Sequence, residues 1–375
     1  MPRSNDSIST SASSGSFTRF EYQVAGHDRL LQHPASDIMV VKPCNQTEQR
    51  FYQDSQQHPE FLQWIPECYG SLHIATEIER QTIAEAQDIA DGIESLSVNE
   101  PNVALDPADT NNFDSFAHHI CLENLLYGFI QPCVIDIKLG TQLYGPDATP
   151  SKRAKMIKKA NETTSGKLGL KICGMQMFDA STNQQILHSK TYIKQITESS
   201  LLDAFVSFFF PHSEVGHTIV EGRERLHLPL EGSRIPAAKM RWIIRSLIED
   251  IDEILETVAN FPEVRMYGAS LLIVYEGDQN TFLNGWEKML EEDRQQEERA
   301  LKQAKDNQAA GDDSEDEEDE DEPSAKLYSI RLIDFAHSFW EEDEVTEQDA
   351  GLLLGLTNAS NILRSVLATQ KEENV

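Results

Sequence analysis

The sequence predicts a mixed α+β protein with room for two or three domains. Residues 38–42 and 271–275 are short, largely apolar segments that indicate strands, and residues 131–140 form a third strand that ends at Gly140. Residues 237–257 repeat apolar side chains at helical spacing, which predicts a long amphipathic helix. The 375 residues exceed one typical domain of about 100–200 residues.

The remaining elements are predicted from the residues that interrupt or end regular structure. Residues 1–16 are Ser-rich and are expected to be a disordered tail. Pro43 is expected to end the first strand, and a helix at 47–52 follows it. Residues 88–114 are interrupted by Asp, Asn and Pro, which predicts a loop. The remaining expected elements are strands at 168–175 and 327–335, helices at 200–211 and 286–307, and a closing helix.

Charge and composition exclude several classes of protein. With 32 basic and 63 acidic residues, the net charge of −31 argues against a direct nucleic-acid partner or an anionic-membrane binder. No apolar run approaches the roughly 18 residues of a transmembrane helix. Five scattered cysteines without a CxxC pair predict neither a disulfide framework nor a zinc cluster. We expect a soluble protein of a reducing compartment.

Residues 311–322 hold ten acidic residues and no basic one. Such a block repels itself and cannot fold alone. We expect an acidic disordered insert at 308–325 that faces solvent. The alternative function is a docking segment for a basic partner, such as a transcription factor or a chromatin protein.

The strand at 131–140 carries the first chemical signal. Alternation gives it an apolar face and a second face on which Asp136 and Lys138 lie two residues apart. A solvent-facing strand shows the same pattern. The pair also suits phosphoryl transfer, because Lys138 can neutralise a phosphate while Asp136 orients a hydroxyl or a ribose, or accepts a proton.

A basic helix follows this strand. Thr149 is a suitable N-cap and Pro150 a suitable first residue. Residues 151–171 contain seven basic residues and one acid, and like charges at helical spacing repel one another. Such a concentration in an acidic chain indicates a polyanion ligand, a solvated helix face or a nuclear-localisation patch. One helical face carries Lys152, Lys155 and Lys159, flanked by Arg153.

Two weaker signals point the same way. Asp334 follows an apolar strand, as the metal-binding aspartates of kinases do. Lys42 ends a strand and Glu48 lies on the helix that follows, as in the phosphate-holding Lys–Glu pair of protein kinases. There is no P-loop, H-R-D loop or HExxH motif, which argues against P-loop enzymes, ordinary protein kinases and zinc hydrolases.

Taken in order, these segments resemble the inositol polyphosphate kinase family. Its P-x-x-x-D-x-K-x-G signature is present from Pro132 to Gly140. Its S-L-L segment begins at Ser270, its I-D-F-A-H segment ends at His337, and a similar L-G-x-x-x-x-G-M stretch occupies residues 168–175. The resemblance covers residues 26–338 and is greatest to the fungal inositol polyphosphate multikinases, which also carry an acidic insert before I-D-F-A-H.

The resemblance implies a two-lobed fold, distantly like that of protein kinases, with ATP between an N-lobe at 17–125 and a C-lobe at 126–375. In the N-lobe, Lys42 would hold the ATP phosphates and Glu48 would orient the Lys42 side chain. The hinge would bind adenine through the backbone of Glu123, Asn124 and Leu125. Asn124 stands where many relatives carry an acid.

In the C-lobe, the resemblance implies that Asp136 contacts the ribose side of ATP or acts as the base, and that Lys138 meets the transferred phosphoryl group and the substrate. Asp334 would hold Mg²⁺, and His337 would face the inositol. The substrate phosphates would be bound by the basic side chains Lys152, Arg153, Lys155, Lys159 and Lys190.

The implied activity is that of a multikinase, which phosphorylates inositol 1,4,5-trisphosphate at the 6- and 3-hydroxyls to tetrakis- and pentakisphosphate. About thirty residues separate Lys138 from Leu168, room for one helix, which implies an open site. The alternatives are a hexakisphosphate kinase and an acidic transcription co-regulator or scaffold with secondary kinase activity. Phosphatidylinositol 4,5-bisphosphate is a further candidate substrate, and the expected location is the nucleus and cytoplasm.

Overall fold

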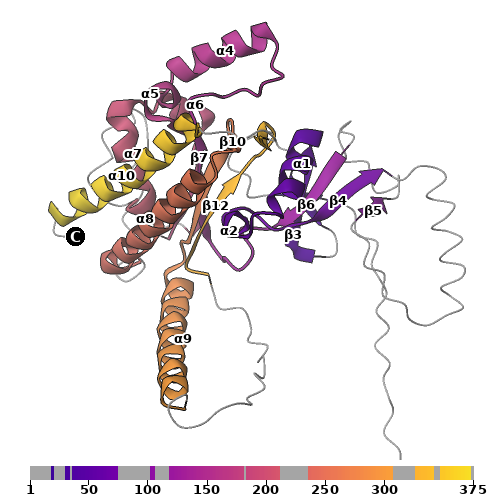
Figure 1. Cartoon of the computed structure of the whole chain (residues 1–375). Helices are drawn as coiled ribbons and strands as arrows, with labels where there is room; N and C mark the ends of the chain where they lie inside the picture. Colours follow the sequence, from indigo (N-terminus) through magenta and orange to yellow (C-terminus); the bar gives the residue numbers. More distant parts are fainter. Residues whose placement is uncertain are drawn as a thin grey trace, which may run out of the picture. The chain divides into compact units, whose positions relative to one another are not determined.

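The structure is a computed structural model (Figure 1). It describes residues 18–20, 30–33, 36–74, 102–105, 118–180, 183–211, 235–306, 326–341 and 347–372. The expected tail at 1–16 and the expected acidic insert at 308–325 lie outside these residues. Among the described helices, none has the length and hydropathy needed to span a membrane.

The chain forms two compact units. Of the described residues, those up to Gln49 and from Glu67 to Asn124 form the first, and those from Arg50 to Pro66 and from Leu125 onward form the second. The expected boundary near residue 125 is therefore not the only crossing, because the segment 50–66 packs with the second unit. One helix, α1 (Gln46–Ser55), contributes its first turn to the first unit and its remainder to the second.

The first unit holds a sheet with the strand order β1-β2-β3-β6-β4-β5. Its strands are β1 (Thr18–Arg19), β2 (Leu31–His33), β3 (Ser36–Cys44), β4 (Cys68–Ile74), β5 (Asn102–Leu105) and β6 (His118–Glu123). Its small core contains Leu31, Val41, Leu72 and Cys121.

Two expectations for this unit are wrong. Pro43 does not end β3, because pairing with β2 stops at Val41 and Pro43 then has a neighbouring strand, β6, on one side only. Residues 88–114 are not all loop, because β5 pairs in parallel with β4. Four residues between Pro101 and Pro107 carry too little periodicity to reveal a strand that its neighbour stabilises.

The second unit is built on an antiparallel sheet with the order β12-β11-β7-β8-β9 and on a separate β10-β13 pair. Its strands are β7 (Pro132–Leu139), β8 (Leu170–Asp179), β9 (Gln184–Leu187), β10 (Val264–Met266), β11 (Ser270–Glu276), β12 (Tyr328–Ile333) and β13 (Ser338–Trp340). Its helices include α2 (Pro59–Leu62), α4 (Pro150–Asn161), α5 (Thr164–Leu168), α6 (Lys190–Gln195), the 3₁₀ turn η2 (Glu198–Ser200), α7 (Leu201–Phe209), α8 (Ala237–Asn260), α9 (Gln279–Asp306) and α10 (Ala350–Glu372).

The apolar face of β7 lies in the main core. Ile135, Ile137 and Leu139 are completely buried there. Helices α8 and α10 lie side by side (Figure 1) and bury their own apolar faces, as the spacing in 237–257 predicts.

Two glycines let α10 reach the sheet. A Cβ on Gly355 would lie 2.2 Å from the Gly169 carbonyl oxygen, and one on Gly351 would lie 2.5 Å from Thr141 Oγ1. The backbone of α10 therefore lies against the start of β8 and the residues that follow β7. Any side chain at either position would force the helix away.

Candidate active site

The second face of β7 collects polar side chains at one end of the sheet. Asp136 and Lys138 share this face, and strand pairing places Ser270 of β11 and Lys171 of β8 on either side of Lys138. A bulge at Cys173 shifts the register between Asp136 and Ile137. The central strand and its neighbour β8 therefore present a carboxylate and two ammonium groups together, while the other face of β7 is entirely apolar.

Lys138 is held by a backbone carbonyl. Its Nζ donates a hydrogen bond of 2.5 Å to the carbonyl oxygen of Gly268, in the turn between β10 and β11. Gly268 has a φ of +70°, a conformation that glycine adopts without strain. The direction of the Lys138 ammonium group thus depends on the conformation of this turn.

Asp136 is a buried carboxyl group with an unusual pKa. Burial raises its pKa to about 6, and the negative charge of Asp334 adds to the rise, while Lys138, Ser270 and Lys171 oppose it. Ser270 lies near the carboxyl, yet neither Asp136 Oδ1 nor Ser270 Oγ has a hydrogen-bond partner among the described residues. Burying an unpaired polar atom costs about 1–3 kcal/mol, so a water molecule or a ligand that bonds to these two oxygens would stabilise them.

Asp334 follows β12 directly, in the left-handed region at a φ of +67°. The next residue, Phe335, anchors it, because its ring lies 4.5 Å from that of Phe51 and 5.4 Å from that of Tyr52. Asp334 is near enough to Asp136 to raise its pKa. One or two carboxylates together with substrate phosphates are the usual Mg²⁺ ligands, so Asp334 and Asp136 are the side chains that would hold a divalent cation.

His337 ends the same loop. Burial lowers its pKa, and the nearby charges of Lys152 and Lys138 lower it further, while Asp147 acts in the opposite sense. A Cβ on Gly145 would lie 3.2 Å from His337 Nδ1, so the imidazole packs closely on the loop that precedes α4. A neutral imidazole can both donate to and accept from hydroxyl groups.

Helix α4 begins as its sequence predicts. Thr149 Oγ1 accepts a hydrogen bond of 3.3 Å from the backbone N–H of Lys152, and Pro150 is the first helical residue. The charge of Lys152 acts on the pKa of His337 and that of Lys159 on the pKa of Lys171, so both charges lie within electrostatic range of the polar end of the sheet.

The other predicted cations lie differently. The guanidinium of Arg153 donates to the carbonyl oxygen of Pro146 at 3.4 Å and lies 5.5 Å from the centre of the Tyr144 ring. Lys155 and Lys190 are exposed on α4 and at the start of α6. No interaction found among the described residues joins either of them to the polar cluster.

Lys171 was counted with the basic segment but was not predicted to belong to the site. It is half-buried, and burial and the charges of Lys159 and Lys138 lower its pKa, against the opposing effect of Cys173. Like charges directly opposite each other on paired strands are destabilising. Only the β7–β8 register, with its bulge, reveals this position, so sequence spacing could not have found it.

The first unit contains the predicted phosphate-holding pair. Lys42 Nζ lies 2.6 Å from Glu48 Oε1, and Glu48 is buried. Asn45 Oδ1 accepts from the backbone N–H of Glu48 at 2.8 Å, which caps α1 and fixes the carboxylate. The pair is preformed, and its role stays a prediction.

Within the predicted hinge, the chain passes from the first compact unit to the second. The backbone N–H of Glu123 donates to Glu67, and that of Asn124 donates to Ile38. The Asn124 side chain donates to the carbonyl oxygen of Asp37 at 2.7 Å, so it secures the start of β3. Leu125 opens the long segment of the second unit. The structure describes each unit by itself, so the binding of ATP between lobes stays a prediction.

Comparison with known proteins identifies relatives of this chain. The model of the family "Inositol polyphosphate kinase" matches residues 119–364. The chain is 28% identical to an inositol polyphosphate multikinase of Saccharomyces cerevisiae over 335 residues, which are 85% of this chain and 90% of that protein. It is 32% identical to the multikinase of Schizosaccharomyces pombe, over 51% of this chain and 62% of that protein.

The chain is also 27% identical to inositol hexakisphosphate kinase 2 of Rattus norvegicus, over 66% of this chain and 51% of that protein. Its fold matches that of a crystallised S. cerevisiae inositol phosphate multikinase in complex with ADP and Mn²⁺. That match has a TM-score of 0.54 and 24% identity and covers 88% of this chain and 99% of the other. This chain therefore belongs to the inositol polyphosphate kinase family and has its two-lobed α+β fold.

Proposed function

We propose that the protein is an ATP- and Mg²⁺-dependent inositol polyphosphate multikinase. Its substrate would be inositol 1,4,5-trisphosphate, phosphorylated at the 6- and 3-hydroxyls to tetrakis- and pentakisphosphate. The observation that carries the proposal is the polar end of the sheet, where Asp136, Lys138 and Lys171 meet Asp334. This cluster, contributed by β7, β8 and the residue after β12, can neutralise phosphates and hold a divalent cation.

Each residue has a task that suits its surroundings. Lys138, fixed by the Gly268 carbonyl oxygen, would direct its ammonium group at the transferred phosphoryl group. Asp136, with a pKa of about 6, would be ionised at neutral pH and able to accept a hydroxyl proton or to contact the ribose. Bound Mg²⁺ would neutralise developing charge on the phosphates, held by Asp334. In the first unit, the Lys42–Glu48 pair would hold the ATP phosphates.

The substrate side supports the multikinase over more selective enzymes. The segment after β7 holds α4 and the five-residue α5, only one short helix more than expected. Lys152, Lys159 and His337 would bind phosphates and hydroxyls of the inositol. A hexakisphosphate kinase is the second candidate, because several proteins of that name match about two thirds of the chain.

The finer assignments are part of the same proposal. Phosphatidylinositol 4,5-bisphosphate would be an additional substrate, since its headgroup carries the 4- and 5-phosphates that inositol 1,4,5-trisphosphate also has. The acidic insert would dock a transcription factor or a chromatin protein. The exposed cations of α4 would also serve as a nuclear-localisation patch, and the proposed location is nucleus and cytoplasm.

One assay separates these possibilities. Purified protein is incubated with ATP and Mg²⁺ and either inositol 1,4,5-trisphosphate or inositol hexakisphosphate, and the products are resolved by anion exchange. Tetrakis- and pentakisphosphate from the first substrate are expected. Pyrophosphate product from the second substrate alone would assign a hexakisphosphate kinase. No turnover of either, with ATP still bound, would favour the scaffold.

A further inference from the structure

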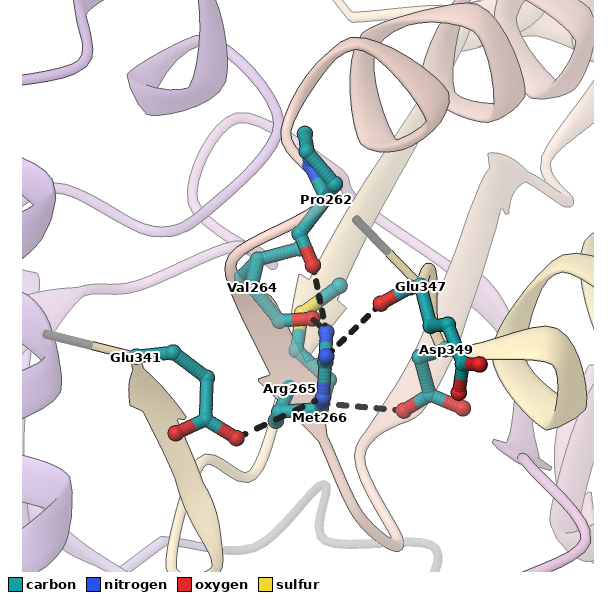
Figure 2. A network of polar contacts seen from close by, with 7 residues as sticks. All are labelled: Pro262, Val264, Arg265, Met266, Glu341, Glu347 and Asp349. Carbon is teal, nitrogen blue, oxygen red and sulfur yellow. Dashed lines mark hydrogen bonds and ion pairs between the residues drawn. The ribbon is translucent and has the colours of Figure 1, made fainter. Parts of the chain in front are cut away.

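Arg265 is a buried cation outside the polar cluster, and its donors are directed at backbone carbonyls (Figure 2). Its Nη1 donates to the carbonyl oxygens of Pro262 at 2.6 Å and Val264 at 2.9 Å, and its Nη2 donates to that of Glu347 at 2.7 Å. The Glu341 carboxylate lies 3.7 Å from Nε. One guanidinium group therefore joins three separate stretches of the chain.

These stretches are the ends of neighbouring elements. In the β10–β13 pair, Arg265 lies opposite Phe339 and Met266 lies opposite Ser338. The backbone N–H of Met266 donates to Asp349 Oδ2 at 3.4 Å, and Asp349 Oδ1 accepts from Leu352 in the first turn of α10. The network thus fixes β10 and β13 to the beginning of α10.

Both strands lead directly into the candidate active site. Two residues after Met266 is Gly268, whose carbonyl oxygen holds Lys138 Nζ. The residue before Ser338 is His337, the end of the loop that begins at Asp334. A shift of the β10–β13 pair would therefore displace the acceptor of Lys138 and the end of the 334–337 loop together.

We propose that Arg265 is a positioning residue for phosphoryl transfer, acting on Lys138 through the Gly268 carbonyl oxygen and on the 334–337 loop through β13. This inference rests on the proposed function. A guanidinium is required, because its planar fork presents several donors in fixed directions, whereas a lysine carries one nitrogen on a flexible stem. One ammonium nitrogen cannot occupy the positions of both Nη1 and Nη2, so a lysine would leave either the Glu347 carbonyl oxygen or those of Pro262 and Val264 without a donor.

The test replaces Arg265→Lys and compares it with Arg364→Lys. Arg364 forms a partly exposed ion pair with Asp252 between α10 and α8, so the control removes the same chemistry away from the network. In Arg265→Lys, kcat with inositol 1,4,5-trisphosphate is expected to fall about 10- to 100-fold, as small misplacements of reacting groups do. The KM for ATP should stay within about twofold, because Lys42 and Glu48 are unchanged. Arg364→Lys should keep wild-type kinetics.

A second readout separates positioning from general stability. The rate at which a small acylating reagent labels Lys138 is followed by mass spectrometry of the folded proteins, with Lys167 as the internal reference. Labelling of Lys138 should increase several-fold in Arg265→Lys only. If that variant does not fold, Glu341→Gln keeps the three carbonyl bonds and should produce a smaller change in the same direction.

The outcomes have distinct meanings. An inactive wild type would overturn the proposed function and leave the labelling test intact. An active wild type with unchanged kcat in Arg265→Lys would overturn the positioning role alone. A lower kcat with unchanged Lys138 labelling would overturn the action on Lys138 through the Gly268 carbonyl oxygen.

Discussion

The two faces of β7 have opposite composition although they alternate along one strand. Ile135, Ile137 and Leu139 are buried in the main core of the second unit. Asp136 and Lys138 point the other way, where a carboxyl oxygen is left unpaired and two lysines lie in register. The apolar face favours folding, whereas the polar face opposes it through desolvation and like-charge repulsion.

This difference shows how the fold supports a site whose charges are unfavourable in the free protein. Chemistry on phosphates requires fixed charges, and fixed charges without their ligand are unfavourable. Because the charged face and the apolar face belong to the same central strand, the packing of the apolar face holds the charged side chains in place. Substitutions on the two faces should therefore separate activity from stability.

Lys138→Ala should have the largest effect on the polar face. We expect kcat/KM to fall by about 10²–10³-fold, because a preorganised cation at the phosphoryl group is removed. The melting temperature should be close to that of the wild type, since no core contact is lost. Steady-state kinetics and calorimetry measure the two effects, and full activity in this variant would refute the site.

Asp136→Asn should lower turnover by about 10²-fold or more and stabilise the free protein. The folded-state pKa of about 6 lies above the unfolded value of about 3.9, so the folded state binds more protons between these values. Wild-type stability should thus fall as the pH rises from about 4 to 6, by an amount of the order of 1–3 kcal/mol, and stay lower above that.

The variant should lack this slope. Urea unfolding of both proteins at several pH values, with a chelator present, measures it. Parallel curves for the two proteins would show that Asp136 does not carry the raised pKa.

Ile137→Ala tests the opposite face. Removing a completely buried side chain should cost about 2–5 kcal/mol of unfolding free energy, with kcat of the folded protein little changed. Ile157→Ala on α4, where the side chain is 46% exposed, is the matched control and should cost less than about 0.5 kcal/mol. Equal losses in the two variants would contradict the division between faces.

Lys171→Met should have the smallest effect and should sharpen the assignment of the polar face. We expect KM for the inositol phosphate to rise about tenfold, since one phosphate contact is worth about 1.4 kcal/mol or more. Stability should be unchanged or higher, because repulsion with Lys138 is relieved. Lys167→Met, which removes an exposed lysine paired with Glu198, is the control. A change in kcat without a change in KM would argue against a binding role for Lys171.

Much of the fold was predictable because its signals are local. The long helix at 237–257, the strand around Asp136 and the Thr149 cap each follow from spacing over a few residues. The weak strand β5 was not predictable, because it depends on a neighbour about thirty residues away. The same limit explains the course of β3 beyond Pro43.

The candidate site divides in the same way. Asp136 and Lys138 lie together because side chains alternate between the two faces of β7, a pattern that can be read from the sequence. The place of Lys171 depends on a bulge in β8, and Arg265 reaches a carbonyl 82 residues further along the chain. Arg153 was expected among the phosphate ligands, and no local pattern shows that its guanidinium packs on Tyr144. Contacts that need the tertiary fold were beyond sequence reasoning.

The glycine contacts of α10 have a consequence for synthesis in the cell. Gly351 and Gly355 place this helix directly on β7 and β8, which are translated more than 170 residues earlier. At about 5–20 residues per second, the ribosome makes α10 roughly 10 to 40 s after β8. During that interval part of the apolar side of the nascent sheet lacks its cover. The growing chain is therefore expected to need chaperone protection until its last described helix emerges.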